Sequence, residues 1–360
     1  MTEQAPFQRA SALAGGQSPI LPPGAAAIDC GEQHSIRLNS PATSYAALDL
    51  GTNNCRLLIA RPSAEGFRVV DSFSRIIRLG EGLTASGLIS DAAIERAMVA
   101  LRICRDKIMA RHTTRMRLIA TEACRTAGNA LAFCARVEDE LGLTLEVVDR
   151  ETEARLAVLG CTPLLDPAAA GAILFDIGGG STELVRINSS ANGGPAEISA
   201  WTSLPAGVVT LAERHGGVDV TPDMYQTMVD EISGYLAPFV RNHRRDLTGF
   251  HLLGTSGTVT TVAGIHLGLP RYDRRVVDGL WMDRPDVDDT VTRLRGMSYQ
   301  QRVAHGCIGS ERADLVLAGC AIFDAIQNAF PCSRVRIADR GLREGMLVQM
   351  MREDGLVGAT

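Results

Sequence analysis

The segment DIGGGSTE, residues 176–183, is the part of the sequence best suited to binding phosphate. Three consecutive glycines remove every Cβ from a turn, so backbone N–H groups can approach an anion closely. Ser181 and Thr182 add hydroxyl donors, and Asp176 and Glu183 supply two carboxylates that could hold Mg²⁺ directly or through water. For the glycine run alone, a tight hairpin turn without a ligand is the structural alternative.

Two other loops have similar chemistry. DLGTNN, residues 49–54, follows an apolar segment, and GTSGT, residues 254–258, precedes a helical pattern. The N–H groups and the dipole at the start of a helix favour an anion, although GTSGT taken alone could be a simple N-cap. Flanking acids and three such loops on one chain favour a phosphate site. Neither GxxxxGK[ST] nor GxGxxG is present, which disfavours those two classes of phosphate-binding protein.

The first loop and the glycine run belong to a repeated pattern. YAALDLGTNNCRLLIARP, residues 45–62, predicts a β-hairpin whose turn carries Asp49 and Asn54, and GAILFDIGGGSTELVRIN, residues 171–188, repeats it. The aligned pairs are Asp49 with Asp176, Gly51 with Gly178 and Leu57 with Leu184. A repeat at near-domain spacing indicates two structurally related halves.

Strands and helices alternate in both halves. Apolar periodicity and helix-start residues predict the following elements: a helix from Ser90 and Asp91, a strand over 116–121, a helix over 129–141, a strand over 143–149, a helix over 151–159, a helix from Thr221 and Pro222, and a strand, loop and helix over 251–264. This alternation predicts an α/β protein with its ligand cleft between the halves.

Composition narrows the class of protein. At 360 residues the chain is about twice the usual ~150 residues per domain, and its hydrophobic (46%) and charged (21%) fractions are those of a globular protein. No apolar run is long enough to span a bilayer, so no membrane partner is expected. A net charge of −5 disfavours an electrostatic nucleic-acid binder.

The cysteines and the N-terminal segment bear on the compartment. Nine cysteines without a CxxC pair suit reduced thiols, which predicts a cytoplasmic protein. Residues 1–40 are rich in Ala, Gly, Pro, Ser and Gln and lack the features of a secretory signal. We expect a disordered or loosely packed tail there.

An ordered set of motifs resembles the exopolyphosphatase/guanosine pentaphosphate phosphohydrolase (Ppx/GppA) family from about residue 45 to 350. The motifs are ALDLGTNNCRLLIA, ATEACRTAGNA, ETEAR, FDIGGGSTELV, SLPAGVVTLAER, LLGTSGTVTTVAG, RADLVLAGCAIF and ADRGLREGM. The resemblance implies two RNase H-like domains of the actin/sugar-kinase/heat-shock-chaperone superfamily flanking a cleft. Domain I would comprise residues 41–150 with 341–360, and domain II residues 151–340.

The resemblance also implies roles for single residues. Glu153 in ETEAR matches the catalytic base, Asp176 and Glu183 match the residues that organise metal and water, and Arg125 matches an arginine that contacts phosphate. The implied cofactor is Mg²⁺, with Mn²⁺ as the alternative. The phosphate-binding set is Asp49, Gly51, Thr52, Asn53, Arg125, Gly178, Gly179, Gly180, Ser181, Gly254, Thr255, Ser256 and Gly257.

The implied activity is hydrolysis of a terminal phosphoanhydride, with inorganic polyphosphate, guanosine pentaphosphate or both as substrate. A homodimer is implied only by resemblance. The alternatives are a catalytically weak polyphosphate or alarmone sensor and an actin-fold kinase. The chain differs from the family pattern at Asn54, Glu122 and Asp278, and its length predicts a short form without the C-terminal HD-like domains of longer relatives.

Overall fold

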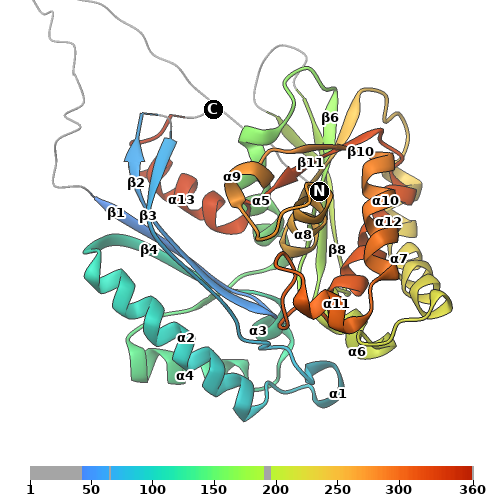
Figure 1. Cartoon of the computed structure of the whole chain (residues 1–360). Helices are drawn as coiled ribbons and strands as arrows, with labels where there is room; N and C mark the ends of the chain where they lie inside the picture. Colours follow the sequence, from blue (N-terminus) through green and yellow to red (C-terminus); the bar gives the residue numbers. More distant parts are fainter. Residues whose placement is uncertain (1–42, 65, 190–195, 359–360) are drawn as a thin grey trace, which may run out of the picture. The chain divides into compact units, whose positions relative to one another are not determined.

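The computed structural model describes residues 43–64, 66–189 and 196–358 (Figure 1). The first sheet has the order β3-β2-β1-β4-β5. Its strands are β1 (Ser44–Leu50), β2 (Asn54–Ser63), β3 (Gly66–Ile76), β4 (Thr113–Ala120) and β5 (Glu146–Val147). β1 is central and almost wholly buried, because its apolar run YAAL packs on both faces of the sheet.

The second sheet repeats this arrangement. Its order is β10-β11-β9-β6-β7-β8, and its strands are β6 (Gly171–Ile177), β7 (Thr182–Asn188), β8 (Glu197–Leu204), β9 (Phe250–Thr255), β10 (Trp281–Asp283) and β11 (Arg334–Ala338). In this sheet, β8-β7-β6 is antiparallel and β6-β9-β11 is parallel. In the same way, β3-β2-β1 of the first sheet is antiparallel and β1-β4-β5 is parallel. The α/β fold of two related RNase H-like halves, expected from the sequence, is confirmed.

The two repeated hairpins match in detail. Gly51 N–H donates to the Asn54 carbonyl at 2.9 Å, and Gly178 N–H donates to the Ser181 carbonyl at 2.9 Å. In register, Asp49 lies opposite Arg56, and Asp176 lies opposite Glu183. The predicted turn was too wide, because Asp49 belongs to β1 and Asn54 to β2, so that only the residues between the strands form the turn.

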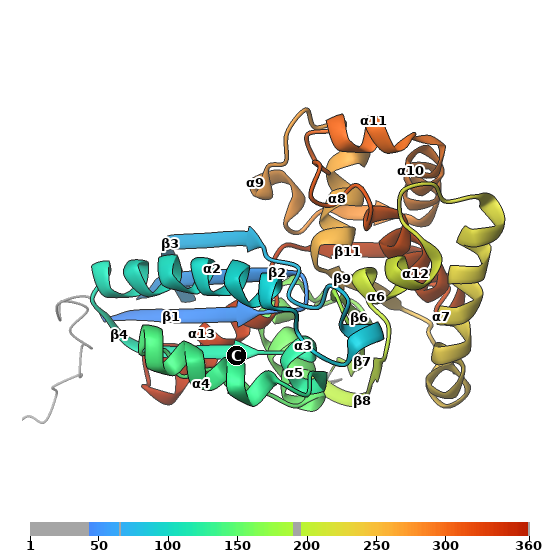
Figure 2. The same ribbon diagram turned by 90° about the horizontal axis from the view of Figure 1, so that it is seen from below.

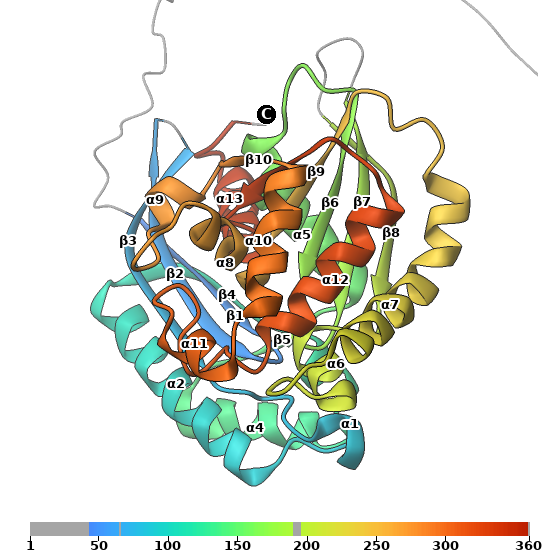
Figure 3. The same cartoon turned by 45° about the vertical axis from the view of Figure 1, so that its right-hand side comes forward.

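Helices cover both sheets (Figures 2 and 3). α2 (Asp91–Ala110) and α4 (Ala130–Leu141) pack on the first sheet, while α7 (Pro222–His243), α8 (Gly257–His266) and α12 (Val316–Ala329) pack on the second. Apart from α5 and α13, which are described below, the other helices are α1 (Leu83–Ser86), α3 (Glu122–Thr126), α6 (Val208–His215), α9 (Arg274–Val277), α10 (Arg284–Gly296), α11 (Tyr299–Ala304) and the 3-10 turn Thr162–Leu164. Side chains of Ser90 and Thr221 accept hydrogen bonds from the first turns of α2 and α7, so these predicted helix starts are confirmed.

Two helices join the halves at the back of the cleft. α5 (Arg150–Cys161) packs on the second sheet, and α13 (Leu342–Glu353) packs on the first. They meet through glycine: a Cβ on Gly160 would lie 2.0 Å from the Gly341 carbonyl oxygen, and a Cβ on Gly345 would lie 2.0 Å from the Leu156 carbonyl oxygen. Only glycine allows this approach, which brings the first turn of α5 to the cleft.

A second connection lies between the loop after β3 and the second half. Arg78 Nη1 and Nη2 donate to the two carboxylate oxygens of Asp314, each at 2.8 Å, and Nη2 also donates to the Glu311 carbonyl at 3.1 Å. Gly82 N–H donates to Glu213 Oε1 at 2.8 Å. The two halves are therefore tied by polar contacts as well as by the glycine crossing.

The structure differs from one of the strands expected from the sequence. The strand predicted over 143–149 is reduced to Glu146–Val147, an edge strand that pairs only with the last two residues of β4. The predicted tail, residues 1–40, lies outside the described residues. Within the described part of the chain, none of the helices has the length and apolar character needed to cross a membrane.

Candidate active site

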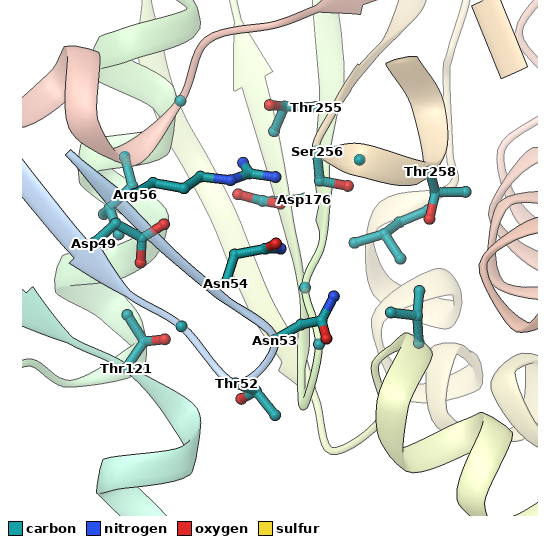
Figure 4. A pocket seen from close by; sticks show the side chains of 18 of the residues that line it. Asp49, Thr52, Asn53, Asn54, Arg56, Thr121, Asp176, Thr255, Ser256 and Thr258 are labelled. Carbon is teal, nitrogen blue, oxygen red and sulfur yellow. The ribbon is translucent and has the colours of Figure 1, made fainter. Parts of the chain in front are cut away.

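The three predicted loops line one cavity (Figure 4). From the phosphate-binding set, the cavity wall contains Asp49, Gly51, Thr52, Asn53, Gly178, Gly179, Gly180, Ser181, Thr255, Ser256 and Gly257. Gly254 lies within β9, where a Cβ would be 2.5 Å from the Phe175 ring and 2.9 Å from Val259. Its place is thus in the packing beneath the loop, and the structure does not bring it to the cavity wall.

The glycine run is packed tightly against the first hairpin. A Cβ on Gly179 would lie 2.9 Å from Thr52 Cβ, and one on Gly180 would lie 2.8 Å from Thr52 Oγ1. The carbonyls of Gly178 and Gly179 accept hydrogen bonds from the N–H groups at the start of α6, at 2.9 and 2.8 Å. The absence of side chains therefore serves close contact between two loops that both border the cavity.

The β9–α8 loop carries backbone strain at the cavity. Ser256 has φ 92°, a conformation that a residue with a Cβ rarely adopts, and its buried Oγ has no hydrogen-bond partner among the described residues. Other buried, unpartnered oxygens in the cavity wall are Asn53 Oδ1 and Asn54 Oδ1. Buried polar groups without partners are costly, so three of them around one cavity indicate a polar ligand.

The three predicted acidic residues also line the cavity. Glu153 lies in the first turn of α5, Asp176 near the end of β6, and Glu183 near the start of β7. Burial, then Glu183 and Asp49, raise the pKa of Asp176 to about 7. Burial also raises the pKa of Glu183, against the effect of its hydrogen bond from Ser203 Oγ at 2.9 Å.

Glu153 has an unusual environment for a carboxylate. Burial and the Glu183 charge raise its pKa well above the usual value, while the Arg125 guanidinium acts in the opposite direction. Its Oε2 lies 2.9 Å from Arg125 Nη2 but makes no hydrogen bond of good geometry among the described residues. A carboxylate with a raised pKa in a cleft is suited to accepting a proton from water.

Arg125 stands behind the cavity wall, bound to acidic residues. Its Nε and Nη2 donate to Glu122 Oε2 at 3.1 and 2.8 Å, and its Nη1 donates to the Val148 carbonyl at 2.7 Å. Glu122, in contrast, is part of the wall. The arginine expected to contact substrate phosphate is therefore in use by neighbouring residues in this structure.

Four arginines in the cavity wall were missed by the sequence reasoning: Arg56, Arg312, Arg340 and Arg343. Burial, followed by the Arg343 charge, lowers the pKa of Arg56, and Arg312 acts in the same direction. Atoms of Arg56 and Arg312 lie 3.9 and 3.7 Å from where a Cβ on Gly257 would be. Two guanidinium groups thus meet at the start of α8, and Figure 4 shows Arg56 reaching toward Ser256.

Asp278, one of the departures noted above, holds another of these arginines. Arg340 Nη2 donates to Asp278 Oδ2 at 2.5 Å, and Asp278 also accepts from the Asp339 N–H at 3.0 Å. Asn54 faces the cavity, as stated above. The register of the first hairpin could have predicted Arg56, because this residue lies opposite Asp49. No local sequence pattern marked Arg312, Arg340 or Arg343 as cavity residues.

The acidic side chains of the cavity wall include oxygen ligands that suit a divalent metal ion. Within the described residues, no three His, Cys, Asp or Glu side chains form a group that could hold a metal ion by themselves. Mg²⁺ commonly takes only one or two carboxylates and completes its shell with water and substrate phosphate. Asp176 and Glu183 fit that smaller role, because they are adjacent acids in the cavity wall, and burial followed by the Glu183 charge raises the pKa of Asp176.

The fold and the cavity define an α/β enzyme of two RNase H-like halves with a cavity lined by loops of both halves. The sequence pattern of the Ppx/GppA phosphatase family matches residues 58–354, and the chain belongs to this family. The expected class of enzyme, a phosphoanhydride hydrolase, is thereby confirmed.

Individual relatives agree with this assignment. Exopolyphosphatase 2 of Mycobacterium tuberculosis is 32% identical over 295 residues, which cover 79% of this chain and 90% of that protein. Guanosine-5′-triphosphate,3′-diphosphate pyrophosphatase of Photobacterium profundum is 29% identical over 85% of this chain but only 59% of its own length. The crystal structure of the Aquifex aeolicus Ppx/GppA family member has a TM-score of 0.72 at 27% identity, covering 87% of this chain and 99% of that one.

Proposed function

We propose that the protein hydrolyses terminal phosphoanhydride bonds, releasing orthophosphate from inorganic polyphosphate, from the 5′ end of guanosine pentaphosphate, or from both. The observation that carries this proposal is the cavity itself, where Glu153 shares one wall with the two glycine-containing hairpins and the start of α8. Relatives named for both activities support it. The two substrates share the reacting group, so the same residues serve either.

In this proposal Glu153 acts as the general base. Its carboxylate, which lines the cavity, accepts a proton from the attacking water, and Arg125 opposes the rise of its pKa and so favours the ionised form. The backbone N–H groups at 52–53 and 179–181 and the guanidinium groups of Arg56 and Arg312 hold the substrate phosphates. Phosphoryl transfer depends mainly on such positioning and charge neutralisation.

A divalent cation, Mg²⁺ or Mn²⁺, belongs to this proposal. Asp176 and Glu183 would hold it, and when bound it neutralises charge on the transferring phosphate. Ser203 keeps the Glu183 carboxylate oriented through its hydrogen bond at 2.9 Å. Ser181, which is 3% exposed, closes the loop next to this pair of acids.

The test is a phosphate-release assay on the whole protein with tripolyphosphate, long-chain polyphosphate and guanosine pentaphosphate, each with Mg²⁺, with Mn²⁺ and with EDTA. The expected result is metal-dependent release from at least one substrate without an added acceptor. Tight binding without release would support a sensor instead. Release that requires ADP or a sugar as acceptor would support a kinase, and metal-independent release would contradict the assigned role of Asp176 and Glu183.

A further inference from the structure

Glu122 is a carboxylate at a site built to attract anions. It is the first residue of α3, it is 8% exposed, and it lines the cavity beside the glycine run. A Cβ on Gly180 would lie 3.0 Å from Glu122 Cγ, so the side chain packs directly against this loop. A negative charge at this point opposes the binding of phosphate, which calls for a physical reason for its presence.

The contacts of Glu122 give that reason. Its Oε1 accepts from Arg150 Nη2 at 2.7 Å, and its Oε2 accepts from Arg125 Nη2 at 2.8 Å and Nε at 3.1 Å. Arg125 Nη2 in turn lies 2.9 Å from Glu153 Oε2. The four side chains form a chain of ion pairs from the surface-reaching Arg150 to Glu153, and their formal charges cancel when all are ionised.

This chain fixes Arg125. With Nη1 on the Val148 carbonyl and Nε and Nη2 on Glu122, the guanidinium has donors in all three directions committed, and its side chain is only 13% exposed. Turning toward a bound phosphate would cost Arg125 at least one of these charge-assisted hydrogen bonds. Before any anion binds, the positive charge of Arg125 is therefore already paired with the carboxylates of Glu153 and Glu122.

We propose that Glu122 is a positioning residue that holds Arg125 against Glu153 and, by its own charge, weakens the grip of the site on orthophosphate. This inference rests on the proposed function, which makes orthophosphate the product. Weak product binding favours release of each phosphate after hydrolysis. Weaker capture of the substrate is the corresponding cost, so the charge at position 122 sets a balance between affinity and turnover.

The test compares Glu122→Gln with Glu151→Gln. Gln keeps the size of Glu122 and removes its charge, and Glu151 is a matched control on the first turn of α5, 46% exposed and paired with Arg155 at 2.7 Å. Binding of inorganic phosphate is measured by calorimetry, and phosphate release is followed with and without added orthophosphate. For Glu122→Gln we expect Kd for phosphate, the product-inhibition constant and KM each to fall about tenfold, as one nearby unit charge at a partly wetted site predicts.

A second variant should change phosphate affinity in the opposite direction. Its side chain is not buried, so the result does not depend on whether a buried position tolerates substitution. Arg150, whose side chain is 41% exposed, supplies the balancing positive charge, so Arg150→Gln should weaken phosphate binding severalfold. Unchanged affinities in both variants, or a lower kcat with unchanged KM and phosphate affinity, would overturn the proposal. Because calorimetry does not require turnover, absence of activity in the wild type would refute the proposed function and still leave the role of Glu122 measurable.

Discussion

Replacing Glu153 by Gln removes the proposed proton acceptor with little change in shape. The carboxylate, whose Oε2 lies 2.9 Å from Arg125 Nη2, is replaced by an amide that cannot take a proton from water. General-base catalysis contributes roughly 10²–10⁴ in rate, which corresponds to about 3–5 kcal/mol of transition-state stabilisation. We therefore expect kcat to fall by at least about a hundredfold.

The same structure predicts smaller effects on binding and folding. Arg125 keeps its hydrogen bonds to Glu122 in this variant, so KM should change by less than about tenfold. Burial raises the pKa of Glu153, so desolvation opposes its charged form in the folded protein. Removing that charge should leave the melting temperature unchanged or raise it, provided that the lost ion pair with Arg125 contributes less than this desolvation.

The assay is steady-state phosphate release with the best substrate of the panel, together with a thermal melt of each variant. Glu151→Gln, two residues away on the same turn, is the control and should keep wild-type kcat. If Glu153→Gln retained more than a tenth of wild-type kcat, Glu153 would not be the general base. A loss of kcat accompanied by a fall in melting temperature of several degrees would point to a structural role.

Three further outcomes are expected. Gly179→Ala should lower kcat/KM by at least about tenfold, because its Cβ would lie 2.9 Å from the facing hairpin, whereas Gly234→Ala, with open space around it, should have no effect. Arg78→Ala should lower the free energy of unfolding by about 1 kcal/mol in denaturant titration, and exchanging the charges of Arg78 and Asp314 should restore part of it. Burial lowers the pKa of His251, so the folded protein binds fewer protons than the unfolded chain at pH values between that pKa and ~6.5. The free energy of unfolding should therefore fall as the pH falls through this window. His251→Gln should flatten the dependence of melting temperature on pH.

The fold was accessible from the sequence where local and long-range signals agree. Asp49 and Asp176 close matching apolar strands before glycine-containing turns, and this repeat alone predicted two related halves. The position of Glu153 in the first turn of a helix also followed from local pattern. These features depend on neighbours along the chain, which sequence reasoning can evaluate.

The remainder of the site depends on contacts between distant segments. Arginine carries nearly all of the basic charge in this sequence, so residue type could not separate Arg312 and Arg343 in the cavity from arginines at the surface. Arg125 pairs with Glu122 within α3, but its contacts with the Val148 carbonyl and with Glu153 join α3 to the segment that runs into α5. No periodicity or spacing reports such contacts, because they form only when the two sheets and α5 come together.

The repeated hairpins differ in charge at one position that lines the cavity. Two identical halves would present an entering molecule with two equivalent orientations. At matching places in the register, however, the first hairpin places Arg56 opposite Asp49, and the second places Glu183 opposite Asp176. This difference in charge at the cavity distinguishes the two related hairpins, so the two ends of the cleft are not equivalent to an entering molecule.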